Sequence, residues 1–195
     1  MKKVVIGFFI FLVVLFAAAA LVPMLFKDKI KQALDKEIAK NINATVIYET
    51  DDVSLSLFRD FPNMSLGVEN LMVVGQDSFA TDTLAKIPSF RMGLDLMSVI
   101  GGNQLKINNI KLENPTIRLL VLKSGKANWD IFIPDTATTA DTDTTASNFR
   151  MAIKNWDVSN GTLFYDDLSI PFGLAAYNVQ HTGSGDFEKC VFDMK

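Results

Sequence analysis

The chain has 195 residues, a formal net charge of −3 and 49% hydrophobic residues, with one cysteine and one histidine. The single cysteine excludes an internal disulfide and a cysteine-paired zinc site, and the single histidine excludes a histidine-based metal cluster. Mild acidity without a basic cluster does not match the charge pattern of a nucleic-acid-binding protein. Apart from the N-terminal apolar run, the length suits one ordinary domain of about 170 residues.

Residues 4–26 form a run without a charge, with Lys2 and Lys3 before it and Lys27 after it. A helix over this run would be about 35 Å long, enough to cross a bilayer core of about 30 Å with some tilt. A cleaved signal peptide is the alternative, but its apolar region is about 7 to 15 residues long, and this run is longer. We therefore predict a transmembrane anchor over residues 1–26, and both interpretations export the rest of the chain.

Residues 27–43 show the spacing of a short amphipathic helix, in which apolar residues recur every three or four positions between lysines and acids. The apolar positions are Ile30, Ala33, Leu34, Ile38 and Ile42. Such a helix can lie on a membrane surface or can cap the first strands of a sheet. The apolar stripe is narrow, and we favour the capping role.

From residue 44 onward the apolar period changes from helical to two, which predicts strands with one apolar face. Short turns rich in glycine, proline and asparagine separate the strands, and short connections favour antiparallel pairing, so residues 44–133 are predicted as a meander. Residues 134–148 are rich in threonine, serine and aspartate and are predicted to be a flexible loop. Residues 149–195 continue the sheet, and because they stop within a strand-like stretch, we expect a truncated piece of a longer protein.

The chain repeats itself across that loop. Residues 107–119 align without a gap with residues 153–165, which lie 46 positions later. Both segments share a strand, an asparagine followed by proline or glycine, a threonine and a second strand. A fainter copy begins at Val68. Similarity at a fixed spacing indicates an array in which each unit buries its apolar face against the next.

No arrangement of residues typical of an enzyme is found in the sequence. His181 lacks a nucleophilic partner, and we interpret it as a residue on the polar face of a strand. Asp166 and Asp167 are adjacent in a predicted strand, so their side chains point to opposite faces and cannot share a site. We read them as a strand end and a turn, and we predict neither a catalytic residue, nor a metal site, nor a cofactor.

Several segments together resemble the N-terminal region of AsmA-family proteins, and the resemblance spans nearly the whole chain. After the apolar N-terminal run they are Asp52–Phe58, Phe61–Pro62, Ile110–Pro115, Gly125–Asp130, Asn160–Asp166 and Gly185–Phe187. The resemblance implies a protein anchored in the inner membrane by one span, with its body in the periplasm, related to bridge-like lipid-transfer proteins. In that group a curved antiparallel sheet presents an apolar groove to phospholipid.

The expected fold is therefore mainly β: a transmembrane helix and a short amphipathic helix, followed by a curved antiparallel sheet that begins an elongated groove. The expected function is phospholipid transport between the inner and outer membranes, in support of outer-membrane homeostasis. The alternative is a closed β-sandwich that serves as a membrane-tethered scaffold for outer-membrane or envelope assembly proteins. The candidate lipid-groove residues are Leu55, Leu57, Leu66, Val68, Met92, Leu94, Leu119 and Val121.

Overall fold

The computed structural model describes most of the chain after the N-terminal apolar run. The described residues are 6, 9–10, 27–60, 63–95, 97–98, 107–133, 154–186 and 191–194. The predicted anchor therefore lies almost entirely outside them, and the predicted loop over residues 134–148 lies wholly outside. Within the described residues, no helix is both long enough and apolar enough to cross a membrane.

Over the residues just named, the structure is mainly β with one longer helix, as the sequence predicts. The helix α2 spans Lys27–Asn41, and η1 (Thr50–Asp52) and η2 (Asp77–Phe79) are short 3-10 turns. The strands are β1 (Thr45–Ile47), β2 (Val53–Asp60), β3 (Asn63–Val74), β4 (Thr83–Asp95), β5 (Ile107–Glu113), β6 (Thr116–Val121), β7 (Asn155–Asp167), β8 (Phe172–Asp186) and β9 (Val191–Met194).

Within the described part of the chain, nine strands form one hydrogen-bonded sheet in the order β1-β3-β4-β5-β7-β8-β9. β2 also pairs with β3, and β6 pairs with both β4 and β7. Within residues 44–133 every strand pair is antiparallel, as predicted. The expectation that the whole sheet is antiparallel is wrong, because β5 and β6 both pair with β7 in parallel. A parallel pair needs a long crossover connection, and the long stretch between β6 and β7 supplies it.

The sequence repeat corresponds to this parallel pairing. Asn109 pairs with Asn155 and Thr116 pairs with Thr162, so every β5 and β6 partner on β7 lies 46 positions later in the chain. The repeated segments are therefore direct neighbours in the sheet and have the same direction. Equivalent residues of the two units lie side by side, which keeps equivalent apolar positions on one face of the sheet.

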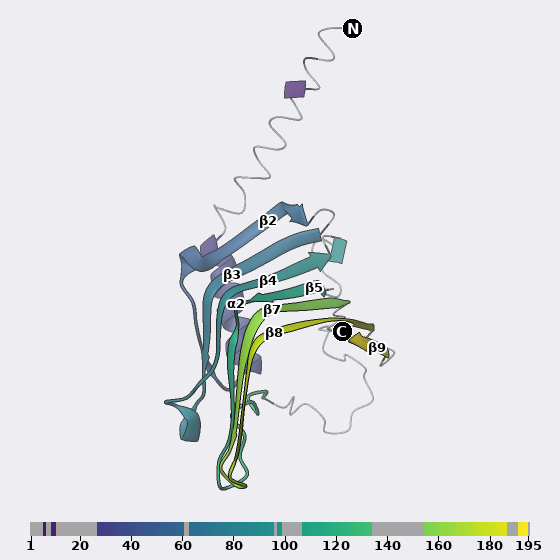
Figure 1. Cartoon of the computed structure of the whole chain (residues 1–195). Helices are drawn as coiled ribbons and strands as arrows, with labels where there is room; N and C mark the ends of the chain where they lie inside the picture. Colours follow the sequence, from purple (N-terminus) through teal and green to yellow (C-terminus); the bar gives the residue numbers. More distant parts are fainter. Residues whose placement is uncertain are drawn as a thin grey trace, which may run out of the picture.

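The sheet is sharply bent. In Figure 1, β3, β4, β7 and β8 run along the upper part of the sheet and then turn downward. β2 and β5 pair with the upper halves of these strands, whereas β1 and β6 pair with the lower halves. We call residues 53–60, 63–69, 89–95, 107–113, 155–159, 181–186 and 191–194 the upper arm. The lower arm comprises residues 45–47, 71–74, 83–87, 116–121, 161–167 and 172–177.

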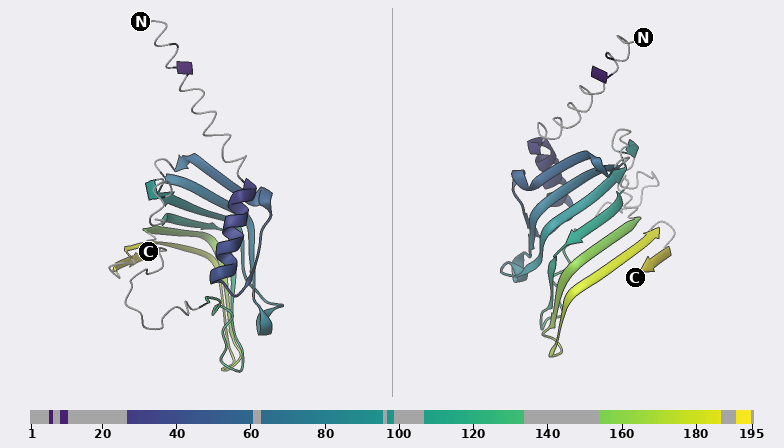
Figure 2. Two further views of the ribbon diagram at one scale, coloured as in Figure 1. Left: turned by 180° about the vertical axis from the view of Figure 1, so that it is seen from behind. Right: turned by 45° about the horizontal axis from the view of Figure 1, so that its top comes forward.

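Helix α2 lies in the angle between the two arms, next to the first strands (Figures 1 and 2). Its Leu34 and Ile38 pack against a buried cluster formed by Tyr48, Val53, Leu66, Val68, Leu94 and Ile107. This is the arrangement of a helix that caps the sheet. Val46 and Leu71 of the lower arm pack against the same cluster, so side chains of both arms and of the helix meet inside the bend.

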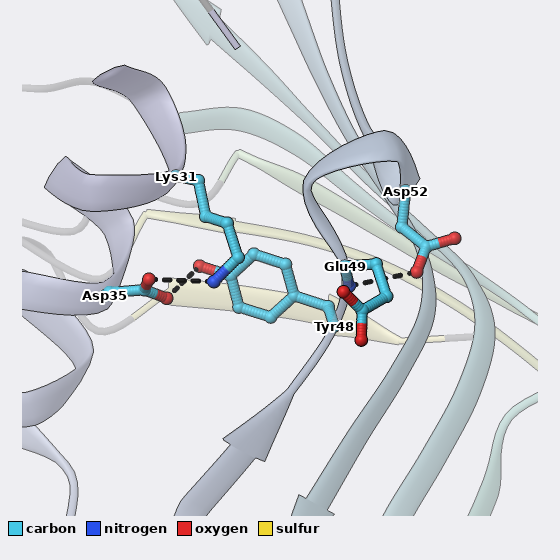
Figure 3. A network of polar contacts seen from close by, with 5 residues as sticks. All are labelled: Lys31, Asp35, Tyr48, Glu49 and Asp52. Carbon is cyan, nitrogen blue, oxygen red and sulfur yellow. Dashed lines mark hydrogen bonds and ion pairs between the residues drawn. The ribbon is translucent and has the colours of Figure 1, made fainter. Parts of the chain in front are cut away.

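A polar network fastens α2 to the sheet (Figure 3). The Tyr48 hydroxyl donates a hydrogen bond of 2.7 Å to Oδ1 of Asp35, and Nζ of Lys31 lies 2.8 Å from Oδ2 of the same carboxylate. Lys31 Nζ also lies 4.7 Å from the centre of the Tyr48 ring. The hydrogen bonds from Lys31 and Tyr48 lower the pKa of Asp35, whereas burial and the bond to Asp35 raise the pKa of Tyr48.

Candidate functional site: an apolar face inside the bend

One face of the upper arm is apolar across five strands. Residues that pair directly across neighbouring strands point to the same face, so the register identifies its members. The row through Leu55, Leu66, Met92, Ile110 and Trp156 crosses β2, β3, β4, β5 and β7 in turn. The rows beside it add Val53, Met64, Val68, Phe90, Leu94, Leu112 and Val158. This apolar face packs against α2 and lies inside the bend; we call it the inner face.

The opposite face of the upper arm is polar at the alternate positions of the same strands. It carries Ser54, Ser65, Gly67, Glu69, Ser89, Arg91, Gly93, Asn109, Lys111, Glu113, Asp157 and Ser159. Arg91 and Glu113 form an ion pair of 3.0 Å on this face, and Ser89 Oγ donates to Glu69 at 3.3 Å. The upper arm is thus strictly amphipathic, with water-compatible groups outside and apolar groups inside.

The inner face continues onto the lower arm through Leu71, which packs against the buried cluster. The pairing places Leu119, Tyr165 and Leu174 in one row of the lower arm, and Ile117 and Leu163 in another row of the same face. At alternate positions the lower arm carries polar groups as well, including the ion pair of 3.4 Å between Arg118 and Asp166. The apolar surface therefore covers both arms inside the bend.

The candidate groove residues separate into three groups by their exposure. Leu66, Val68 and Leu94 are buried in the cluster beneath α2, so they belong to the core. We call this part of the inner face, where α2 covers the first strands, the closed end. The half-buried ones are Leu55 and Met92 on the upper arm and Leu119 and Val121 on the lower arm. These seven side chains lie on the inner face. The side chain of Leu57 lies outside the described residues.

Sequence reasoning missed the residues that continue the inner face beyond β4. Ile110, Leu112, Trp156 and Val158 extend it on the upper arm, and all four are half-buried. The gap-free repeat was the signal that could have found them, because a residue and its counterpart 46 positions later share a face when the two units pair in register. The open part of the inner face therefore lies on β5, β7 and β8, away from α2.

His181 lies on the inner face, so its assignment to a polar strand face was wrong. It pairs with Val158, and its ring meets the Trp156 indole edge-on at a centroid distance of 6.2 Å. Two register shifts between β7 and β8 interrupt the alternation of side chains between the two faces of the sheet. The face of a residue beyond these shifts therefore does not follow from the period of two in the sequence. The indole lies over Gly183, where an added Cβ would collide with the ring.

The segment Gly125–Asp130 ties the lower arm to α2. Its Asn128 is 2% exposed; Oδ1 accepts a hydrogen bond of 2.9 Å from the Leu120 N–H, and Nδ2 donates one of 2.7 Å to the Arg118 carbonyl. β4 pairs with β6 only at Thr116 and Ile117. The Asn128 side chain therefore supplies hydrogen-bond partners to backbone groups of β6 beyond that pairing. Residues 131–133 then hydrogen-bond to the backbone of residues 41–43 at the end of α2.

Aromatic side chains line the lower arm near this segment. The Tyr165 ring centre lies 6.2 Å from that of Trp129 and 6.0 Å from that of Phe172. Burial and the neighbouring Asp167 raise the pKa of the Tyr165 hydroxyl, while hydrogen bonds from Ser169 lower the pKa of Asp167. Asp167 ends β7 and caps the following turn, so the pair of aspartates is a strand end and a turn, as the sequence indicates.

A hollow of about 400 Å³ adjoins the closed end of the inner face. Its apolar lining includes Ile38, Ala39 and Ile42 of the helix side together with Val46 and Ile133. Ile38 and Val46 also pack against the buried cluster, so the hollow borders the apolar interior of the bend. Taken together, the surface inside the bend suits long apolar ligands, because its contacts are hydrophobic and extend over several strands.

Comparison with known protein families gives one match. The AsmA family model matches residues 1–190, which is nearly the whole chain. Searches of curated proteins and of solved structures gave no match. The match covers α2 and the strands β1 to β8, which together carry the inner face. On this evidence the chain belongs to the AsmA family.

Proposed function

We propose that the inner face binds phospholipid acyl chains and that the protein contributes to phospholipid transport between the inner and outer membranes. In this proposal residues 1–26 anchor the chain in the inner membrane by a single span, and the sheet lies in the periplasm. The role is non-enzymatic, and the ligand is held by apolar contacts. Family membership is consistent with a lipid-transport or envelope-related role.

The observation that carries the proposal is the one-sided polarity of the upper arm in a single bent sheet. In a β-sandwich, the apolar face of one sheet is buried against a second sheet. Here the described strands form one sheet, and α2 covers the inner face only next to the first strands. Among the described residues, Leu112 of β5 and Trp156 and Val158 of β7 are half-buried on the inner face, and Leu174 of β8 is exposed.

The energetics favour such a surface for lipid movement. Exposing an acyl chain to water costs about 0.8 kcal/mol per methylene, so a chain of sixteen carbons costs on the order of 12 kcal/mol. An apolar face that spans both arms offers contacts to the whole chain length and lowers this barrier. The polar outer face keeps the same strands compatible with water, so transport needs no catalytic group.

Native mass spectrometry with lipid extraction tests the proposal on the chain purified from a bacterial envelope. The perturbing variants are Leu112→Asp and Leu119→Asp, which place a carboxylate at a half-buried position of the inner face on each arm, outside the buried cluster. Lys111→Asp is the matched control, because it puts the same group at the adjacent position on the outer face of β5. Buried positions such as Leu94 are unsuitable, since a carboxylate there would unfold the core.

We expect the wild type and Lys111→Asp to retain phospholipid, and the two inner-face variants to lose most of it while keeping the far-UV circular dichroism of a folded sheet. A folded wild-type chain that carries no lipid would refute the proposal. That result would favour the alternative of a membrane-tethered scaffold for envelope assembly proteins.

A further inference from the structure

Four asparagines adopt a left-handed backbone conformation within the sheet. Asn70, Asn114, Asn160 and Asn178 have φ angles of 52°, 54°, 53° and 53°. L-residues other than glycine rarely adopt positive φ, and asparagine is among the few that do so readily. One of the four occurs in each of β3, β7 and β8, and Asn114 lies between β5 and β6.

The four positions lie on one line across the sheet. Asn114 and Asn160 are equivalent in the parallel repeat, because every pair around them has the same offset. On β4, the antiparallel register places Pro88 opposite Asn70. Asn160 and Asn178 both fall in the region where the register between β7 and β8 shifts, which is the signature of β-bulges. Proline fits such a line because it lacks the N–H that a continuous ladder would need.

This line coincides with the bend. The partner of β3 changes from β2 to β1 across Asn70, and the partner of β4 changes from β5 to β6 across Pro88. Figure 1 shows the long strands turning downward between these two sets of partners. All four asparagine side chains are exposed, so packing does not explain their identity. Their backbone conformation does, because a left-handed residue turns the strand out of its plane.

We propose that these four asparagines are positioning residues that fold the sheet into a trough and set the angle between its arms. The geometric part of this proposal does not depend on lipid binding. The role of the bend in lipid binding rests on the proposed function, since the angle determines whether both arms contact one acyl chain. A substitution that cannot adopt positive φ will straighten the strand locally and open the trough.

A distance measurement between the arms tests the inference. Spin labels are attached by Lys111→Cys and Lys123→Cys in the full chain, in a Cys190→Ser background; Lys111 is in the upper arm, and Lys123 follows the lower-arm strand β6. A straight strand would separate these two Cα atoms by about 40 Å, and the bend shortens that distance. Double electron–electron resonance then compares the wild type with Asn114→Val plus Asn160→Val.

The expected result is a longer and broader distance distribution for the valine variant. The matched glycine variant, Asn114→Gly plus Asn160→Gly, should keep the wild-type mean distance, because glycine adopts positive φ without strain. Asp77→Val is the second control: Asp77 also has a φ of 52°, but it lies in η2 outside the line, so the distance should not change.

A folded valine variant with the wild-type distance would overturn the inference. If the double variant does not fold, Asn114→Val alone is compared with Asn114→Gly, and equal distances for these two would overturn it as well. Retained phospholipid is measured on the same samples. Wild-type protein without lipid would refute the proposed function, and the distance measurement would still test whether the asparagines set the angle between the arms. A valine variant with a longer distance that keeps its lipid would refute only the link between that angle and lipid binding.

Discussion

Asn128 tests how the segment between β6 and α2 is fastened to the lower arm. Its side chain bonds to the Leu120 N–H and to the Arg118 carbonyl, which lie on the stretch of β6 beyond its pairing with β4. Substitution by alanine removes both partners at once. Because Asn128 is 2% exposed, its two backbone partners are shielded from bulk water.

The size of the effect follows from the two groups left without partners. A buried donor or acceptor that loses its hydrogen bond costs about 1 to 3 kcal/mol, so the loss of two should lower the free energy of unfolding of Asn128→Ala by about 2 to 6 kcal/mol. Domains of this size are stabilised by about 5 to 15 kcal/mol in total. The variant should therefore be only marginally stable, and the segment that connects β6 to α2 should open first.

Equilibrium unfolding in urea, followed by far-UV circular dichroism, measures this effect. Asn155→Ala is the matched control, because Asn155 is exposed and donates one long hydrogen bond of 3.5 Å to the Asn108 carbonyl. We expect the control to stay within about 0.5 kcal/mol of the wild type. An Asn128→Ala variant that unfolds at the control's midpoint would refute the reasoning that its two bonds hold the edge of β6.

Three further predictions concern the closed end and the inner face. The pKa of Asp35 is held below its ordinary value of 3.8, first by the hydrogen bond from Lys31, so its contribution to stability is present above that value and disappears as the pH falls through the lowered pKa. The difference in unfolding free energy between wild type and Asp35→Asn should therefore shrink in acid, and a pH-independent difference would contradict this. Gly183→Ala should cost about 1 to 3 kcal/mol because its Cβ meets the Trp156 indole, and Trp156→Leu should recover most of the loss; equal losses in both backgrounds would count against that contact. Leu66→Ala should cost about 2 to 5 kcal/mol in urea unfolding, since Leu66 is 5% exposed in the cluster beneath α2, and a loss below about 1 kcal/mol would show that the cluster is not the core.

Much of the architecture was predictable because it depends on local periodicity. The helical spacing after residue 26 matches α2, which ends at Asn41, two residues before the predicted end. The period of two in residues 53–57, 64–68, 90–94 and 117–121 matches strands whose apolar positions share the inner face. Seven candidate groove residues lie on that face because side-chain direction follows from strand period once the residues are in a strand. The family also followed from ordered short motifs over the whole chain.

The parallel pairing could not be read from the strands themselves. Short connections predict antiparallel neighbours, and most pairs in the sheet are indeed antiparallel. The partner of β5 and β6 is instead a strand beyond a long connection, and only the contact between distant segments decides that. The repeat at 46 residues indicated similar units but gave no direction or register.

The sequence by itself determined which residues alternate, which segment is helical, and that no disulfide forms within the chain, because these properties depend on neighbours in the chain or on composition. The tertiary structure decided which apolar positions are core and which are only half-buried, since Leu66 and Leu94 lie in the cluster that packs against α2, whereas Leu112 and Trp156 lie outside it. It also decided the face of the sheet on which His181 lies, because bulges between β7 and β8 shift the alternation of side chains between the two faces. Burial and bending both arise from contacts between distant segments, and such contacts have no signature in local spacing.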